Sequence, residues 1–318
     1  MHAHHGKIIM NKILFQLTRW FDNEAVNQTH AKTIDEYAVD WWRVVPFILL
    51  HVSIVSLFWV GVSWFAAVFC AVLYAIRMFA ITAFYHRYFA HKTYRTSRIV
   101  QFLFAILGST AVQRGPLWWA SHHRHHHVHS DEAPDAHSPV QHGFLWSHLG
   151  WFLSQANFAT KHDRVKELSA FPELRFLDRF DIIIPILFAV SIYVLGAQLA
   201  LHAPHLNTSG PQLLVWGFVI STIALYHGTF TVNSLAHVWG KRRYATKDQS
   251  RNNWFIAIIT LGEGWHNNHH HFPGSASQGF YWWEIDLTYY GLKLMAATGL
   301  IWDLRKVPLN IRNSRKIV

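Results

Sequence analysis

The sequence has little cysteine and little charge. Its 318 residues include one cysteine, Cys70, and only 14% of the residues are charged. One cysteine excludes an internal disulfide and any metal site built from several thiolates, iron–sulfur centres included. Ligands for a metal ion must therefore be histidines, with carboxylates or amides in support.

Charged residues are missing from two long stretches. Residues 182–240 contain no Asp, Glu, Lys or Arg, and residues 44–85 contain only Arg77. Each stretch is long enough for two membrane helices of roughly 20 residues. A buried pair of helices in a soluble protein is the alternative for the first stretch, and its length disfavours that alternative. We therefore predict four spans, at about 44–62, 65–85, 182–201 and 212–235.

Three local features qualify this pattern. Arg77 lies inside the second predicted span, so it should either reach for the membrane surface or pair within the bundle. Residues 99–112 are apolar but too short to cross a bilayer comfortably, which predicts a shallow or protein-covered helix. Gly115 and Pro116 then break that helix.

Lysine and arginine are absent from two predicted turns. The turns around Val62 and Thr208 contain neither residue, whereas the other connections are rich in both. The positive-inside rule then places both chain termini and the polar connections in the cytosol. The expected fold is an all-α membrane protein with four transmembrane helices, arranged as two hairpins that carry a cytosolic helical cap.

The same pattern divides the chain into three parts. We expect residues 1–43 to form an N-terminal cytosolic or interfacial segment, residues 44–272 the membrane and cap domain, and residues 273–318 a C-terminal cytosolic segment. Residues 1–17 lack a long apolar core followed by a small-residue cleavage site, so we expect no cleavable signal peptide. The prediction is an integral, multi-pass membrane protein.

Positive charge is in excess. The formal net charge is +10 with histidine counted as neutral, which suits anionic lipid head groups or an acidic protein partner. The basic residues are scattered and no recognition motif accompanies them. A nucleic-acid partner is therefore not expected.

Histidine is abundant, and three clusters stand out among the 25 histidines. Two clusters repeat the spacing H-x-x-H-H, which places three imidazoles on one face of a helix, and the third has the spacing H-x4-H. Neutral imidazoles that converge in this way suit iron, zinc, copper or nickel. The clusters are His86 and His91; His123, His126 and His127; and His266, His269 and His270. We predict that they fold together around two metal ions at a membrane surface.

Spacing alone leaves the register of the ligands open. In the central cluster, an alternative stripe at i, i+3, i+4 and i+7 comprises His122, His125, His126 and His129. In the last cluster, His270 and His271 could instead pair with Asn267. The pattern therefore indicates a metal centre but does not determine which histidines are its ligands.

The three clusters resemble the histidine boxes of the membrane fatty-acid desaturases. The matching motifs are H-R-Y-F-A-H from His86, H-R-H-H-H from His123 and H-N-N-H-H from His266. More specifically, S-H-L-G-W at 147–151 and N-S-L-A-H at 233–237 are similar to signatures of the stearoyl-CoA desaturase type. The resemblance extends from about Trp41 to Phe272.

This resemblance implies a complete set of metal ligands for two iron ions, with dioxygen as co-substrate. The implied ligands are His86, His91, His123, His126, His127, His237, His266, His269 and His270, with Asn233 in contact through water. Zinc would bind the same imidazoles but cannot change its redox state. We also expect carboxylates to orient the ligands from behind, and the candidates are Asp131, Asp135 and Glu263.

The resemblance also implies a reaction. Two hydrogens leave adjacent carbons of a saturated acyl chain, which gives a cis double bond, expected at the ninth carbon. Gln113 and Trp119 correspond to the pair that shapes the bend of the acyl tunnel, although packing at the membrane interface is an alternative role for Trp119. The chain contains no haem-binding domain, so a separate ferredoxin, rubredoxin or small cytochrome must supply two electrons, and an acidic donor would suit the basic chain.

The chain departs from the acyl-CoA enzymes at positions that carry basic residues there. Ser121 stands where a basic residue commonly precedes the second box, and Gln155 with Ala156 replaces a basic pair after S-H-L-G-W. Acyl-CoA remains the favoured substrate, with a membrane glycerolipid or acyl carrier protein as alternative carriers of the acyl chain.

Two other functions use similar residues. A hydroxylase on the same scaffold would use the same metals but add oxygen to carbon. A metal transporter would place ligands along its spans, where only His51 and His227 lie and no acidic residue joins them. The transporter is therefore disfavoured.

Overall fold

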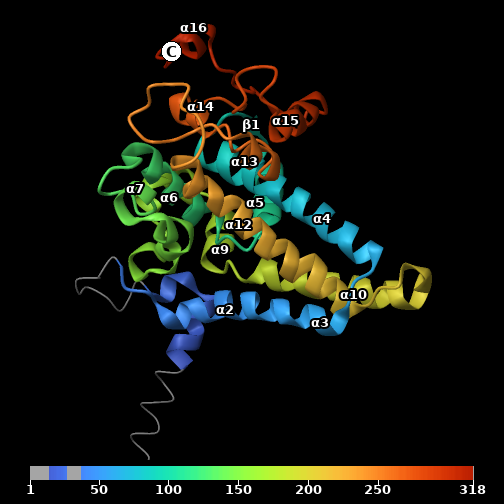
Figure 1. Ribbon diagram of the computed structural model, residues 1–318. Helices are drawn as coiled ribbons and strands as arrows, with labels where there is room; N and C mark the ends of the chain where they lie inside the picture. The colour runs from blue at the N-terminus through green and yellow to red at the C-terminus, as the bar shows by residue number, and fades with distance from the viewer. Residues whose placement is uncertain (1–13, 27–36, 318) are drawn as a thin grey trace, which may run out of the picture.

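The computed structural model describes residues 14–26 and 37–317, and these residues are mostly helical (Figure 1). The N-terminal part expected at 1–43 thus lies partly outside the described residues. Four helical segments are long and apolar enough to cross a membrane. Their bounds are Trp41–Val60, Trp64–Ala90, Ile183–His202 and Gly210–His237.

The first segment comprises α2 (Trp41–Val52), the 3₁₀ turn η2 (Ser53–Ser56) and α3 (Leu57–Val60). It begins three residues before the predicted residue 44, because Asp40 accepts a hydrogen bond from the backbone N–H of Arg43 and so caps the helix. It ends at Gly61, whose φ of +63° turns the chain.

The second segment comprises α4 (Trp64–Phe79) and the π-helical η3 (Ala80–Ala90). The helix therefore continues five residues past the predicted end at residue 85 and carries His86 within it. The Arg77 side chain pairs within the bundle: it donates to Thr110 O at 3.0 and 2.6 Å and to the hydroxyls of Ser221 and Thr222, both at 2.7 Å.

The third segment is α10 (Ile183–His202), followed by the short η8 (Pro204–Leu206). The fourth is built from α11 (Gly210–Leu213), the π-helical η9 (Leu214–Ile220), α12 (Ser221–Asn233) and η10 (Leu235–His237). Within their most apolar windows, 56% of the fourth segment is buried but only 6% of the first and 17% of the third. The fourth segment is therefore central among the four.

Shorter helices gather beside one end of the long ones (Figure 1). They are α5 (Arg98–Ser109), α6 (Pro116–His129), α7 (Pro139–His142), η4 (Trp146–Gly150), η5 (Trp151–Leu153), η6 (Gln155–Asn157), η7 (His162–Arg164), α8 (Lys166–Ser169), α9 (Pro172–Arg179), α13 (Trp254–Ile259), α14 (His266–His271), α15 (Leu287–Ala297) and α16 (Leu309–Asn313). The strands β1 (Arg95–Thr96) and β2 (Ile301–Trp302) pair antiparallel. Before the first segment lie a helix at 14–21 and η1 (Asn23–Val26).

The main hydrophobic core surrounds η3. It includes Ile81, Tyr85 and Phe104, each at most 3% exposed. A Cβ atom on Gly108 would lie 2.0 Å from Cε1 of Tyr85, so only glycine allows α5 to approach η3 this closely. This packing fixes the stretch of chain that presents His86.

Candidate metal centre

The first turn of α6, the central histidine helix, holds the helix in place. Pro116 occupies the first helical position, where a missing N–H costs nothing. Two residues later, the backbone N–H of Trp118 donates to Oδ1 of buried Asp178 at 2.7 Å. The helix then presents His123, His126 and His127 toward the η3 and α14 histidines.

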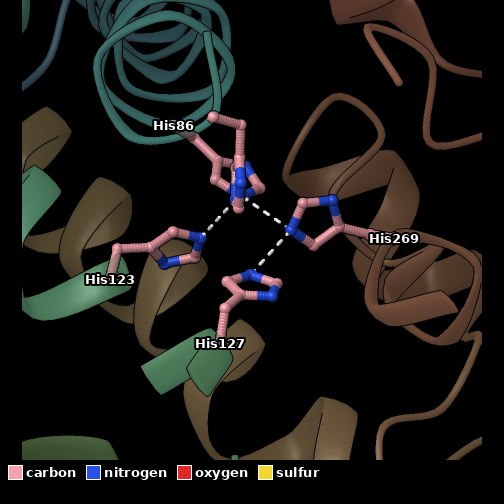
Figure 2. A group of neighbouring side chains, drawn as sticks. His86, His123, His127 and His269 are labelled. Atoms are coloured by element: carbon pink, nitrogen blue, oxygen red, sulfur yellow. Dashed lines mark hydrogen bonds between the residues drawn. The ribbon is translucent and has the colours of Figure 1, made fainter. Parts of the chain in front are cut away.

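Five histidines form the first group, and their ligating atoms all lie within 4.8 Å of one another. The members are His86, His91, His123, His127 and His269. Nε2 of His269 lies 3.0 Å from Nε2 of His86 and 2.9 Å from Nε2 of His127. The Nε2 atoms of His91 and His123 are 2.8 Å apart. Figure 2 shows the imidazoles of His86, His123, His127 and His269 turned toward a common point.

Four histidines form the second group, again with ligating atoms within 4.8 Å of one another. The members are His126, His237, His266 and His270. The Nε2 atoms of His237 and His266 lie 3.0 Å apart. The rings of His127 and His270, one from each group, have centroids 4.5 Å apart, so the two groups adjoin.

Carboxylates contact four of these imidazoles at Nδ1. The pairs are His126 with Asp135 at 2.9 Å, His237 with Asp131 at 2.9 Å, His270 with Asp248 at 2.8 Å, and His86 with Glu263. A carboxylate at Nδ1 holds the proton on that nitrogen and leaves the lone pair of Nε2 free for a metal ion. Asp131, Asp135 and Glu263 are the carboxylates that the sequence suggested, whereas Asp248 was missed.

The missed residues have no distinctive sequence pattern. Asp248 stands in a polar stretch after a basic run, where a solvated carboxylate is the ordinary expectation. His137, whose Nδ1 lies 2.7 Å from Oδ1 of Asp135, shares that carboxylate with His126. Gln278 donates to Glu263 at 2.6 Å and lies 3.2 Å from Nδ1 of His86. Only their place in the fold identifies these residues as supports of the histidine groups.

The residues fit a metal ion on three counts. First, two imidazole nitrogens bound at right angles to one ion, with bonds of about 2.1 Å, are about 3.0 Å apart, as these pairs are. Second, Nε2 of His270 is buried and has no hydrogen-bond partner among the described residues, a costly state that a metal bond relieves. Third, burial lowers the pKa of His126 to about 3 and those of His123 and His127 well below the ordinary value. These imidazoles are neutral at pH 7, the form that binds metals.

An apolar cavity of about 420 Å³ reaches this centre. Gln113, Trp119, His123 and Asn233 line it together. Trp119 Nε1 donates to Oε1 of Gln113 at 3.4 Å, and Gln113 in turn donates to Oγ1 of Thr229 at 2.9 Å. Asn233 also lines a smaller cavity beside His266. The predicted substrate residues therefore lie where the cavity meets the histidines.

The alternative histidine stripe does not enter the groups, apart from His126. His122 is buried against Trp118, and its Nε2 lies 3.3 Å from the Ala159 carbonyl. The Nε2 atom of His125 lies 3.0 Å from the Pro134 carbonyl. Asn267 accepts hydrogen bonds from the backbone N–H groups of Arg243 and Tyr244 instead of facing a histidine group.

The chain matches known proteins over most of its length. The family model described as fatty acid desaturase matches residues 62–301. A palmitoyl-monogalactosyldiacylglycerol delta-7 desaturase from Arabidopsis thaliana is 38% identical over 235 residues, which are 73% of this chain and 59% of that protein. An acyl-CoA C20 delta5-desaturase from Anemone leveillei is 38% identical over 234 residues, 73% of this chain and 70% of that one.

One relative is covered almost completely. It is an sn-1 stearoyl-lipid 9-desaturase from Anabaena variabilis, 34% identical over 270 residues, which are 84% of this chain and 94% of that protein. The chain thus spans less than two thirds of the Arabidopsis relative and nearly all of the Anabaena one. With its paired histidine groups and the match over 62–301, this chain belongs to the fatty acid desaturase family.

Proposed function

We propose that this chain is a membrane acyl desaturase that uses two iron ions and dioxygen to insert a cis double bond into a saturated acyl chain. The observation that carries the proposal is the meeting of two adjoining histidine groups with an apolar cavity of about 420 Å³. Membership of the family supports an oxidoreductase that acts on fatty acyl chains.

In this proposal each histidine group holds one iron ion. The five imidazoles of the first group would hold the first ion and the four of the second group would hold the second ion. Asn233 would contact the centre through water. An all-nitrogen donor set suits iron, and imidazole also binds zinc. Iron is proposed because the reaction needs a metal that changes its redox state.

Iron held by these residues would supply the activation of dioxygen, which no side chain can supply. The residues of this chain place the acyl chain and keep water away from it. Gln113 and Trp119, joined by their hydrogen bond, form the wall at which the acyl chain bends toward His123. The carboxylates behind the imidazoles hold the ligands in one tautomer and orientation.

We place the double bond at the ninth carbon and the acyl group on CoA or on a membrane lipid. The relatives named above are described as acting at carbons 5, 7 or 9, on lipid-bound or CoA-bound chains. The motifs S-H-L-G-W and N-S-L-A-H support the stearoyl-CoA type, whereas Ser121, Gln155 and Ala156 remove basic contacts expected for CoA. Two electrons come from a separate acidic ferredoxin, rubredoxin or small cytochrome.

We also propose a multi-pass topology of two hairpins, with both termini, the histidine groups and their helical cap in the cytosol. In this division residues 44–272 form the membrane and cap domain between two cytosolic segments. Gln212 Nε2 donates to Val60 O at 3.0 Å and Trp216 Nε1 to Gly61 O at 2.9 Å. These bonds support the proposal that the two short turns lacking lysine and arginine lie at the same end of the four long helices.

The test is expression in a host that lacks unsaturated lipids, with double bonds mapped by mass spectrometry. Wild-type protein should give products two hydrogens lighter than the substrate. His126→Ala should abolish them while the protein stays in the membrane, because the second group then loses a ligand. His125→Ala is the matched control from the same helix and should retain product, since His125 faces the Pro134 carbonyl.

Two results would overturn the proposal. Products heavier by one oxygen would indicate a hydroxylase. Full desaturation by the His126→Ala protein would show that the reaction does not require the proposed metal centre.

A further inference from the structure

Part of the cavity lining is cationic. Arg19, Arg43 and Arg114 line the same cavity as His123, together with Asn23 and Asp181. These residues come from the helix at 14–21, η1, α2 and the connections that precede α6 and α10. The desaturation proposed above assigns them no role.

Two of the three arginines have a carboxylate partner. Arg19 pairs with Asp40, and Arg114 Nε lies 2.8 Å from Oδ2 of Asp181. Arg43 forms no ion pair with any described residue. It is the one arginine of the three whose guanidinium has no direct carboxylate partner within 14–26 or 37–317.

Arg43 is also incompletely hydrogen-bonded. Its Nε and Nη2 donate to the Arg19 carbonyl at 3.2 and 2.7 Å, and Nη2 donates to Oδ1 of Asn23 at 2.9 Å. Its Nη1 is buried and has no hydrogen-bond partner within 14–26 or 37–317. Arg43 as a whole is only 9% exposed. A buried, charged donor without a partner is expensive, and an anionic ligand relieves that cost.

The surroundings hold the guanidinium in place. Its Cζ lies 4.7 Å from the ring centroid of Phe158, and Arg114 Cζ lies 5.3 Å from the same ring. Asn23 accepts from both arginines, since Arg114 Nη2 also donates to its Oδ1 at 3.1 Å. Arg179 fixes the neighbouring turn of chain through Asp22 at 2.7 Å. Arg43 is therefore a rigid donor in a built site.

Its position also matters. Arg43 lies in the first turn of α2, where the aligned peptide dipoles add positive potential and where the first membrane segment begins. Pro46 and Ile186 line the cavity and are also exposed on the outer faces of α2 and α10. The cavity lining thus extends to the exposed surface of α2 and α10, close to the start of the first candidate membrane segment.

We propose that Arg43 binds a phosphate oxygen of the molecule that carries the acyl chain, and so selects phosphate-bearing carriers. The phosphate is the phosphodiester of a glycerophospholipid or a phosphate of CoA. A planar guanidinium is suited to phosphate oxygens, and Nη1 is the donor left free for one. The inference rests on the proposed desaturation, because the same cavity must hold the acyl chain.

The test compares three stearoyl carriers with the metal-loaded protein: phosphatidylglycerol in vesicles, stearoyl-CoA, and monogalactosyldiacylglycerol, which has no phosphate. The measured quantity is the ratio of kcat/KM for each phosphate-bearing carrier to that for the galactolipid. Arg43→Gln should lower this ratio about tenfold for the carrier that the enzyme uses, mainly through KM, the scale of one lost charge-assisted hydrogen bond. Arg43→Lys should restore part of it.

A second measurement does not depend on turnover. Native mass spectrometry of the detergent-purified protein should show less retained phosphatidylglycerol or stearoyl-CoA in Arg43→Gln than in wild type. Arg98→Gln is the matched control, because Arg98 is an exposed arginine paired with Glu173. The source of the phosphate is the carrier for which Arg43→Gln lowers both the retained amount and the kcat/KM ratio.

Two outcomes would overturn the proposal. One is an unchanged ratio and unchanged retention in Arg43→Gln; the other is an equal fall for all three carriers together with a lower unfolding temperature, which makes Arg43 a structural residue. A failure of the proposed desaturase function would give a different result. No carrier would then be desaturated by wild type, while the retention measurement would still report on Arg43.

Discussion

At the scale of single residues, the pairing of carboxylate with imidazole decides which nitrogen faces the centre. Spacing predicted the three clusters but left two registers open, and the family resemblance selected among them. The structure brings together those nine imidazoles. Asp248 could not be predicted, because its contact with Nδ1 of His270 joins an irregular loop to α14. Such a contact produces no regular spacing of residues that a sequence pattern could reveal.

Asp248→Asn should weaken metal binding by the second group about 10- to 100-fold, the usual cost of losing a support behind a ligating histidine. The physical reason is that the amide cannot hold His270 through a charged hydrogen bond at Nδ1. Iron content measured along a titration with a chelator tests this. Glu132→Gln is the control, since Glu132 is exposed and pairs with Lys247. Equal iron retention in both variants would contradict the role given to Asp248.

At the scale of elements, apolar length located the four segments and local packing set their ends. The first segment begins at Trp41 because Asp40 caps it, and the second continues through η3 to Ala90. The π-helical form of η3 could not be predicted, because it depends on tertiary contacts with α5 and α6. The close approach at Gly108 is one such contact.

Gly108→Ala should destabilise the protein by roughly 1–3 kcal/mol, the usual cost of overpacking. The new methyl group would meet the ring of Tyr85, which is fully buried and hydrogen-bonded to Ser109 at 3.0 Å. Denaturant unfolding of the detergent-purified protein measures the change. In the control, Gly274→Ala, the nearest atom lies 3.6 Å away, an ordinary contact. If the two variants unfold alike, the Gly108 contact is not the constraint described here.

At the scale of the whole molecule, the distribution of lysine and arginine predicts orientation. The charge pattern predicts that the short turn before α11 faces away from the cytosol and that the basic stretch after η10 faces it. Side-chain packing does not reveal which end of the helices faces the cytosol. Orientation therefore stays a prediction that labelling must test.

The single native cysteine makes that test clean. In a Cys70→Ala background, a cysteine at exposed His205 should react with an impermeant thiol reagent added outside intact cells. A cysteine at exposed Lys241 should react only after the cells are opened. The opposite pattern would invert the topology, and labelling of both sites from outside would rule out the two-hairpin arrangement.

The division of the histidines between the two groups has a consequence for how the protein is made. Four of the five imidazoles of the first group precede the third candidate membrane segment in the chain, and three of the four of the second group follow it. During synthesis the first group is thus nearly complete on a half-made polypeptide, while the second has only His126. In the proposed di-iron enzyme, the first site would therefore have four of its five imidazoles early in synthesis, whereas the second would gain most of its ligands only when almost the whole chain has left the ribosome.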